Sequence, residues 1–244
     1  MNRIHLESVV STNIYLKERA GELPHFTCVS AVRQTAGRGR LGRSWNDGGV
    51  SALFSILIKD GLTLERLESL PLIAAVAVHK TLAVLVRRIR IKWPNDIVIH
   101  YRKMAGILVE SVIEANIPHA AVVGIGINVN EVAFPDGLES IATSVLQESG
   151  RKSAIGPLID GIIAAFAAEW EAVLAGSDDY IGYCNRHSAL KGERIFFVQN
   201  GVRMDGIAGR MLPDGSLKVK TKHGTICLKS GEVTISGGMR LPSE

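Results

Sequence analysis

Residues 34–45 read QTAGRGRLGRSW, and this stretch holds three glycines and three arginines within positions 37–43. Glycine permits backbone conformations with positive φ and lets main-chain N–H groups come close to a ligand. Arginine carries a planar, permanently charged guanidinium group that fits carboxylates and phosphates. The composition therefore predicts a flexible, cationic loop that wraps an anion and later releases it.

The same glycines, Gly37, Gly39 and Gly42, also match the dinucleotide-binding pattern GxGxxG. That interpretation requires a strand before the pattern and a helix directly after it. Residues 26–32 are suitable for the strand, but residues 44–49 (SWNDGG) are rich in turn formers and begin a helix poorly. A Rossmann site is therefore disfavoured, and a solvated basic loop without a ligand stands as a second alternative.

The composition restricts the class of protein. The chain has 244 residues and is 46% hydrophobic, which is enough for a real core in one large domain or in one domain plus a small one. A net charge of +4 fits an enzyme with anionic substrates and falls short of that of a nucleic-acid coat.

The sequence also indicates a compartment. The three cysteines lie far apart without CxxC spacing, so we expect free thiols in a reducing environment. The first residues, MNRIH, lack the apolar core of a signal peptide, and the apolar run at 70–78 stops at His79 and Lys80. We therefore expect a cytoplasmic protein that does not span a membrane.

The apolar runs predict an α+β fold with a mixed, largely antiparallel sheet and packed helices. Short connections between successive strands favour antiparallel pairing. Ser11, Thr12 and Asn13 are good N-cap residues for the first helix, and Pro71 is expected in the first turn of the second. Expected strands span 26–32, 51–59, 90–93, 97–101, 104–113 and 120–128, and expected helices span 14–19, 70–86, 155–174 and 179–187.

The pattern changes in the last quarter of the chain. From 193 to 236, short alternating strands are separated by the hairpin dipeptides Asn200-Gly201, Asp214-Gly215 and His223-Gly224. About five strands in such a short segment indicate a small β-barrel of the SH3-like kind. We therefore expect two domains, 1–188 and 189–244.

Two further segments carry polar groups at suitable places. KWPND (92–96) lies at a strand-to-strand turn, and KMAGILVE (103–110) starts a buried strand with Lys103 and has Gly106 three residues on. The glycine leaves room for a ligand against the backbone, and the lysine supplies a point charge. The alternatives are an exposed turn lysine, and Asn95 and Asp96 side chains that only cap their own turn.

Taken together, these segments resemble the catalytic domain of the biotin protein ligases, the biotin–[acetyl-CoA-carboxylase] ligases. The matching segments are STN (11–13), Gln34 with GRGRLGRSW (37–45), KWPND, KMAGILVE and GIGINVN (124–130). The resemblance implies a class II aminoacyl-tRNA synthetase-like domain followed by an SH3-like barrel. It also implies formation of biotinyl-5′-AMP from biotin and ATP, and transfer of biotin to a lysine of a biotin carboxyl carrier protein.

The resemblance further implies a set of site residues, with Mg²⁺ accompanying ATP but with no metal ligands identified. The catalytic residues would be Lys103, Arg38, Arg40 and Asp96. Biotin would be bound by Ser11, Thr12, Asn13, Gln34, Gly37, Arg38, Gly39, Arg40, Lys103 and Gly106. ATP would be bound by Arg38, Arg40, Arg43, Trp45, Lys92, Asn95 and Asn128.

Two features depart from the family pattern. The chain begins close to the STN segment, so we expect a monofunctional ligase without the N-terminal helix-turn-helix of bifunctional members and without DNA binding. The segment from Trp45 to Ser55 looks slightly short, with Ser51-Ala52 where an Asn-Leu pair is common, which affects the expected loop closure. The family contains both monomers and homodimers, and the sequence favours neither.

Two other functions are alternatives. A lipoyl or octanoyl transferase has a related fold and a related acceptor lysine, but its chemistry does not call for GRGR together with KWPND. A non-catalytic biotin sensor or nucleic-acid module belongs to another class, and nucleic-acid binding calls for an extended basic stripe. Here the basic residues cluster in one loop.

Overall fold

The chain forms a mixed α+β structure with one large and one small sheet. The computed structural model describes residues 2–45, 49–199, 201–229, 231 and 233–235. The large sheet has seven strands in the order β1-β2-β3-β7-β6-β5-β4. Strand β1 pairs in parallel with β2, and the other neighbours pair antiparallel, which confirms the mixed, largely antiparallel sheet. The strands are β1 (Arg3–Val9), β2 (Cys28–Gln34), β3 (Ala52–Ile58), β4 (Arg90–Lys92), β5 (Asp96–Ile99), β6 (Arg102–Glu114) and β7 (Ile117–Ile127).

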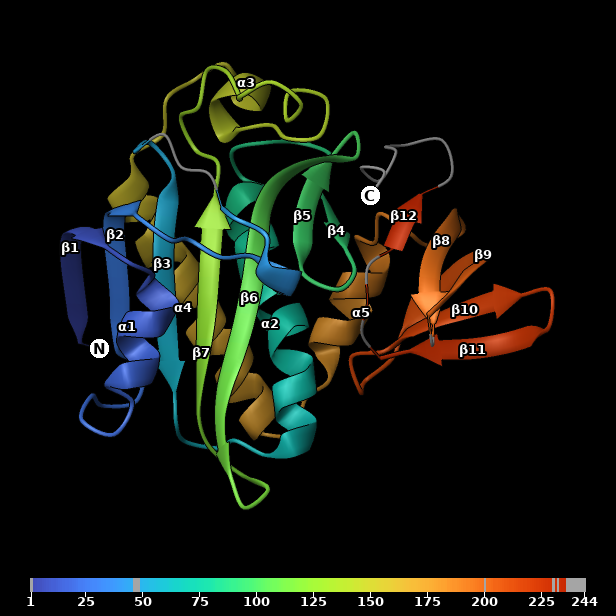
Figure 1. Cartoon of the computed structure of the whole chain (residues 1–244), viewed down its shortest axis with the longest axis horizontal. Helices are drawn as coiled ribbons and strands as arrows, with labels where there is room; N and C mark the ends of the chain where they lie inside the picture. The colour runs from blue at the N-terminus through green and yellow to red at the C-terminus, as the bar shows by residue number, and fades with distance from the viewer. Residues whose placement is uncertain (1, 46–48, 200, 230, 232, 236–244) are drawn as a thin grey trace.

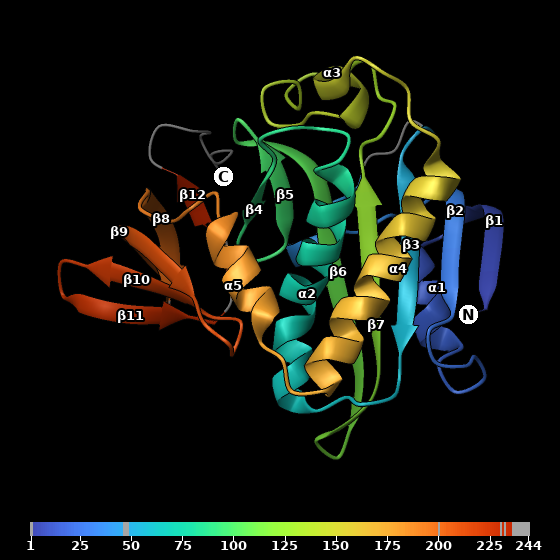
Figure 2. The same cartoon turned by 180° about the vertical axis from the view of Figure 1, so that it is seen from behind.

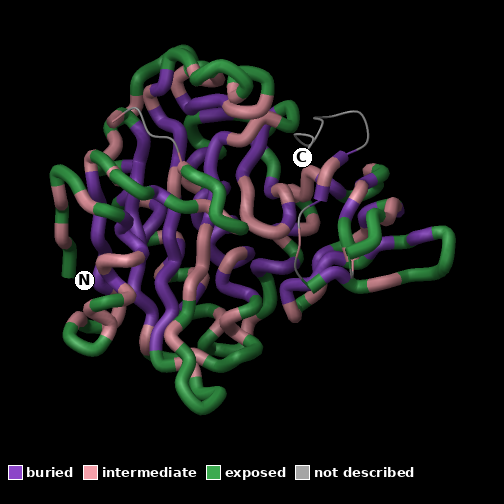
Figure 3. Tube along the Cα trace, viewed as in Figure 1, coloured by how far each residue is buried: buried purple, intermediate pink, exposed green. Residues whose placement is uncertain are grey.

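Helices cover both faces of this sheet. Helix α1 lies on one face, over the middle strands, while α2 and α4 lie on the other (Figures 1 and 2). Strand β3 is buried at every position because it runs between α1 and α4, and Figure 3 shows this buried centre. The helices are α1 (Thr12–Glu18), α2 (Leu64–Leu82), α3 (Val145–Ser149), α4 (Ile155–Leu174) and α5 (Asp179–Arg186).

Several features differ from the sequence-based expectation. Strand β1 was not expected, because its residues are mostly exposed and give only a weak pattern, and the short helix α3 was not expected either. Pro71 lies inside α2 and not in its first turn. The helix begins earlier than the apolar run, since Thr63 caps it by accepting a hydrogen bond of 3.1 Å from the Arg66 backbone N–H.

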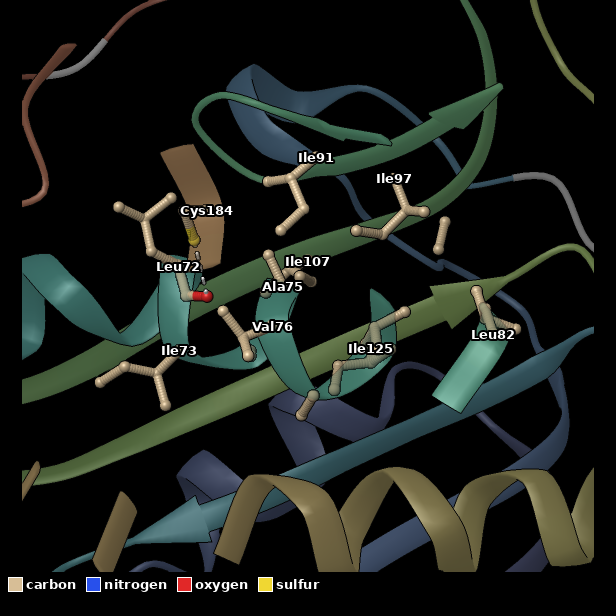
Figure 4. Packing of buried hydrophobic residues seen from close by; sticks show 14 of the residues in the cluster. Leu72, Ile73, Ala75, Val76, Leu82, Ile91, Ile97, Ile107, Ile125 and Cys184 are labelled. Carbon is tan, nitrogen blue, oxygen red and sulfur yellow. Dashed lines mark hydrogen bonds between the residues drawn. The ribbon is translucent and has the colours of Figure 1, made fainter. Parts of the chain in front are cut away.

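The core forms where α2 packs on the sheet. Side chains such as Leu72 and Val76 of α2 lie against Ile107 and Ile125 of the central strands (Figure 4). Burying one such side chain stabilises the fold by about 1.5–3 kcal/mol. Cys184 of α5 is fully buried there, and burial raises the pKa of its thiol to about 12, which keeps the thiol protonated and unreactive.

The second sheet is antiparallel and has five strands in the order β11-β10-β9-β8-β12. The predicted hairpins at Asp214-Gly215 and His223-Gly224 lie between consecutive strands, while Asn200 falls outside the described residues. The strands are β8 (Arg194–Gln199), β9 (Val202–Met211), β10 (Leu217–Thr221), β11 (Gly224–Leu228) and β12 (Val233–Ile235).

Hydrogen bonds join the second sheet and the turn before β10 to Trp93, which follows β4, and to helix α5. Trp93 Nε1 donates to the Gly215 carbonyl at 2.8 Å, and the Tyr180 hydroxyl donates to the Pro213 carbonyl at 3.0 Å. Asn185 and Met211 exchange two hydrogen bonds of 2.8 and 2.9 Å. The small sheet is therefore held beside α5 and the β4 edge of the large sheet (Figure 1).

The helices in the described part of the chain include none that is long and apolar enough to cross a bilayer.

A buried histidine makes the stability of this fold depend on pH. His79 of α2 is 2% exposed, with Nδ1 2.9 Å from the Tyr183 hydroxyl and Nε2 3.1 Å from the Ile89 carbonyl oxygen. Burial lowers its pKa from the ordinary 6.5 to about 4, although the hydrogen bond to the Ile89 carbonyl acts in the opposite direction. Between these values the unfolded chain binds more protons, so stability falls as the pH is lowered.

We therefore expect the free energy of unfolding to fall by about 3 kcal/mol from His79 alone as the pH is lowered from 6.5 to 4. Urea denaturation at several pH values measures this. The variant His79→Gln keeps a polar side chain without the titration, so its stability curve should be flatter over this window. Parallel curves for the two proteins would contradict the assignment.

Candidate active site

A single cavity of about 830 Å³ collects almost all of the predicted site residues. It lies between the start of α1, the loop from β2 to β3, the β4–β5 hairpin and the middle of β6 and β7. Its wall includes Ser11, Thr12, Asn13, Gln34, Arg38, Gly39, Arg40, Arg43, Trp45, Lys92, Asn95, Asp96, Lys103, Gly106 and Asn128. Gly37 does not line it; a Cβ there would lie 3.0 Å from Gln34 Nε2, so this glycine serves packing at the base of the loop.

The start of α1 brings hydroxyl and amide groups to one end of the cavity. Ser11 is the N-cap residue, but its side chain makes no capping hydrogen bond. Thr12 instead donates its backbone N–H to Gln34 Oε1 at 2.8 Å, and its hydroxyl lies 3.1 Å from the same oxygen. The interpretation of these side chains as helix caps is therefore wrong: Ser11 holds the N-cap position without a capping bond, and the Thr12 and Asn13 side chains contact neighbouring strands.

The glycine- and arginine-rich loop folds back on itself. Trp45 N–H donates to the Gly37 carbonyl at 3.0 Å, and a short 3₁₀ turn, η1 (Arg40–Gly42), lies between them. Leu41 and Gly42 both have positive φ, of 54° and 75°. The next regular element is strand β3 and not a helix, so the Rossmann alternative is wrong. The segment from Trp45 to Ser55, expected to be short, includes residues 46–48, which lie outside the described residues, so that expectation stays a prediction.

Arg40 connects the loop to two other parts of the molecule. Its Nη1 donates to Asn95 Oδ1 at 3.3 Å and to the Gly231 carbonyl at 3.2 Å. Asn95 is itself fixed, since its Nδ2 donates to the Ile107 carbonyl at 2.7 Å. The guanidinium group is thus held between the β4–β5 hairpin and the connection from β11 to β12.

Lys103 and Asp96 form an ion pair in the middle of the cavity, with Nζ 2.8 Å from Oδ1. The Lys103 backbone is clamped, because its N–H donates to the Ile141 carbonyl (2.7 Å) and its carbonyl accepts from Thr143 N–H (2.9 Å). Lys103 is therefore not a freely exposed turn residue. Asp96 and Asn95 bind groups outside their own turn, so the self-capping alternative also fails.

Trp45 lies on a floor formed by Gly106 and Gly126, which face each other across β6 and β7. A Cβ on Gly126 would lie 2.7 Å from the indole, and one on Gly106 would lie 2.8 Å from Lys103 Nζ. The Lys103 ammonium is 5.5 Å from the indole centroid, within cation–π range. The room left at Gly106 is thus taken by Lys103 and Trp45 in this structure.

Asn128 ties the end of β7 to the following segment. Its Nδ2 donates to the Thr143 carbonyl at 3.1 Å and to the Lys103 carbonyl at 3.4 Å. Its Oδ1 is then the atom suited to face a ligand. Arg43 and Lys92 also line the cavity, from the loop and from β4.

Several wall residues were missed by sequence analysis. Strand β12 contributes Val233, Thr234 and Ile235, and the segment after β7 contributes apolar residues around Phe134 and Leu138. Neither segment carries a local signal of function. Glu131, which is also in the wall, is buried and accepts a hydrogen bond from Ser51.

The cavity is strongly cationic. Among the described residues, five cations line it (Arg38, Arg40, Arg43, Lys92 and Lys103) against the two carboxylates Asp96 and Glu131. Within the described part of the chain, no group of three His, Cys, Asp or Glu side chains is placed to hold a metal ion. The arrangement suits a ligand with several negative charges, bound beside a group that needs directed hydrogen bonds.

The chain belongs to the Biotin/lipoate A/B protein ligase family, whose sequence profile matches residues 6–128. Among its relatives, the biotin–[acetyl-CoA-carboxylase] ligase of Paracoccus denitrificans is 31% identical over 93% of this chain and 98% of that protein.

A bifunctional ligase/repressor BirA of Bacillus spizizenii is 39% identical over 168 residues, or 67% of this chain. The chain spans about half the length of the curated Bacillus relatives that it matches. Among solved structures, the biotin protein ligase from Aquifex aeolicus in complex with biotin and ATP superposes with a TM-score of 0.84 at 26% identity, covering 96% of this chain and 98% of that chain.

Proposed function

We propose that this protein is a biotin–[biotin carboxyl carrier protein] ligase that forms biotinyl-5′-AMP from biotin and ATP and transfers biotin to a carrier lysine. One cavity contains both the hydrogen-bonding end at Thr12 and Gln34 and the cationic centre at Lys103. This arrangement is the main support for the proposal. Membership of the family and similarity to the Aquifex aeolicus ligase with bound biotin and ATP support it.

In the first step, a biotin carboxylate oxygen attacks the α-phosphorus of ATP, and pyrophosphate leaves. Two anions must approach each other, and unit charges 4 Å apart repel by about 4 kcal/mol at an effective dielectric constant of 20. Lys103, Arg38 and Arg40 offset this repulsion. Mg²⁺ would enter as the ATP complex, because Mg²⁺ is commonly held through substrate phosphates and few protein carboxylates.

The remaining residues divide between the two substrates. Ser11, Thr12 and Gln34 hydrogen-bond the ureido and carboxylate ends of biotin. Trp45 packs on adenine with the indole face that is turned away from the glycine floor, and Asn128 offers Oδ1 on the nucleotide side. Biotin further contacts Asn13, Gly39 and Gly106, while Gly37, which lies outside the cavity wall, supports the loop, and the nucleotide phosphates and ribose contact Arg43, Lys92 and Asn95.

In the second step, the carrier's lysine amine attacks the carbonyl carbon of the mixed anhydride, the bond to the phosphate oxygen breaks, and AMP leaves. Asp96 steers this amine once Lys103 has turned towards the ligand's anionic groups. The loop held by Arg40 excludes water, which would otherwise hydrolyse the intermediate.

The finer description of the fold is also a proposal. We infer that the large sheet belongs to the class II aminoacyl-tRNA synthetase-like fold and that the small sheet is an SH3-like barrel. The domain boundary is placed near 188–189, between the end of α5 at Arg186 and the start of β8 at Arg194. We propose a cytoplasmic protein that does not bind DNA, as a monomer or a homodimer.

One assay tests the proposed function directly. The full chain is incubated with MgATP, biotin and a biotin carboxyl carrier domain, and the carrier is probed for biotin. We expect ATP-dependent labelling of the carrier, absent without nucleotide. The matched reaction with lipoate or octanoate tests the other branch of the family, and labelling with lipoate or octanoate alone would overturn the proposal.

A further inference from the structure

A continuous line of polar side chains runs beneath α1 from the surface to the cavity. At the surface end, Lys17 Nζ lies 2.7 Å from Glu110 Oε1. Glu110 Oε2 accepts from Asn13 Nδ2 at 2.9 Å, although the two residues are 97 positions apart in the chain. The line continues through Ser55 and Thr12 and ends at Gln34 in the cavity wall.

Ser55 is the central member of this line. It is fully buried on β3, where its neighbours Phe54 and Ile56 are apolar. A buried hydroxyl is costly unless it is hydrogen-bonded. Its Oγ lies 2.6 Å from Asn13 Oδ1 and 2.7 Å from Thr12 Oγ1, so it joins the two residues at the start of α1.

Glu110 is the negatively charged residue near the surface end of this line, where it orients Asn13. Burial alone would raise the pKa of its carboxyl, but the hydrogen bonds from Lys17 and Asn13 outweigh burial and lower it. The side chain is therefore ionised at neutral pH. Hydrogen bonds to an ionised acceptor are stronger than those between neutral groups, so Asn13 is firmly oriented.

Both donor hydrogens of the Asn13 amide are used within the protein. Its Nδ2 donates to Glu110 and to the Leu108 carbonyl (3.2 Å), and its Oδ1 accepts from Ser55. A Cβ on Gly124 would lie 2.1 Å from Asn13 Oδ1, so the sheet leaves room for one placement only. The hydrogen bonds that join Asn13 to Ser55 and Glu110 thus fix the position of the start of α1.

At the cavity, this geometry sets the direction of a donor. Gln34 Oε1 accepts a hydrogen bond from the Thr12 backbone N–H at 2.8 Å, so its Nε2 is directed to the loop side, next to Gly37. Gln34 is therefore presented as a donor to an acceptor group of the ligand. Ser55 and Glu110 themselves do not belong to the cavity wall.

We propose that Ser55 and Glu110 are positioning residues for the biotin end of the site, which act through Asn13 and Thr12 on the donor groups of Gln34. This inference rests on the proposed function. The nucleotide end, at Trp45 and Asn128, does not share this line of hydrogen bonds, so binding of ATP does not depend on it.

The test measures biotin-dependent pyrophosphate exchange and thermal unfolding for the full-length variants Ser55→Ala, Glu110→Ala and Glu110→Gln. We expect the two alanine variants to raise the KM for biotin about tenfold, with kcat and the KM for ATP changed less than about twofold. Glu110→Gln still accepts from Asn13 and should recover most of the biotin affinity.

Ser69→Ala is the matched control. Ser69 is likewise a buried serine, and its hydroxyl donates to the Pro213 carbonyl at 3.2 Å, outside the cavity wall. It should lower the unfolding temperature without moving the KM for biotin.

Equal changes in both KM values for Ser55→Ala and Glu110→Ala, or a change in unfolding temperature alone, would overturn the positioning role. Failure of the proposed function would look different, because the unaltered chain would then show no biotin-dependent exchange, and both proposals would fall.

Discussion

Replacing Lys103 by alanine is expected to reduce biotin-dependent pyrophosphate exchange by about 10²–10³-fold, the usual effect of removing one preorganised charge-stabilising group. Lys103 is clamped at its backbone by two hydrogen bonds and carries its ammonium into the centre of the cavity. Its loss also leaves the Asp96 carboxylate without its 2.8 Å ion-pair partner in a site that must receive two anions.

A control variant and a double variant test the role of Lys103. Lys80→Ala removes a lysine that is also paired with a carboxylate, Glu169 at 2.5 Å, but outside the cavity wall, and exchange should be unchanged. In the double variant Lys103→Ala with Asp96→Asn, part of the loss should be recovered, because the unpaired negative charge is gone. Near-normal exchange by Lys103→Ala would remove this residue from the mechanism.

The substitution Arg40→Gly is expected to retain adenylate formation, because Lys103 and Arg38 still offset the charge repulsion, but to release the intermediate into solution. In the structure, Arg40 holds the loop to Asn95 and to the Gly231 carbonyl, so its loss frees the loop from both anchors at once. Released biotinyl-5′-AMP would acylate lysines of an unrelated bystander protein. The measurement compares biotin on the bystander with biotin on the carrier domain.

Leu41→Gly is the control for loop flexibility. Leu41 is adjacent to Arg40, is 76% exposed and has a φ of 54°, a conformation that glycine adopts without strain. This variant introduces the same residue without removing a guanidinium group, so it should retain the intermediate. An Arg40→Gly enzyme that labels only the carrier, with unchanged affinity for the intermediate, would show that the loop role is assigned wrongly.

The elements of this fold were largely predictable because their patterns are local. The fully buried and mostly apolar β3, the long helix α4 and the hairpins at Asp214 and His223 each follow from a short stretch of sequence. Strand β1 escaped prediction because only the parallel partner β2 gives it a place in the sheet. The start of α2 was misplaced because its first turn is polar and depends on the Thr63 cap.

The residues of the site also fall into a predictable and an unpredictable group. Its cationic and hydroxyl-bearing residues stand in short motifs such as GRGR and KWPND, and the structure brings nearly all of them to one cavity. The wall formed by β12 was not predictable, since its apolar residues look like any other small strand. The same holds for Ser55, which is one serine within an apolar run.

The amino-acid sequence by itself therefore determined which segments become strands and helices and which motifs can bind anions. Only the tertiary structure decided which of these motifs meet, as when Arg40 reaches Gly231, 191 positions away, or Asn13 reaches Glu110. The physical reason is that backbone conformation depends on neighbouring residues, whereas contacts between distant side chains depend on strand order and register, which the packing of the whole core sets.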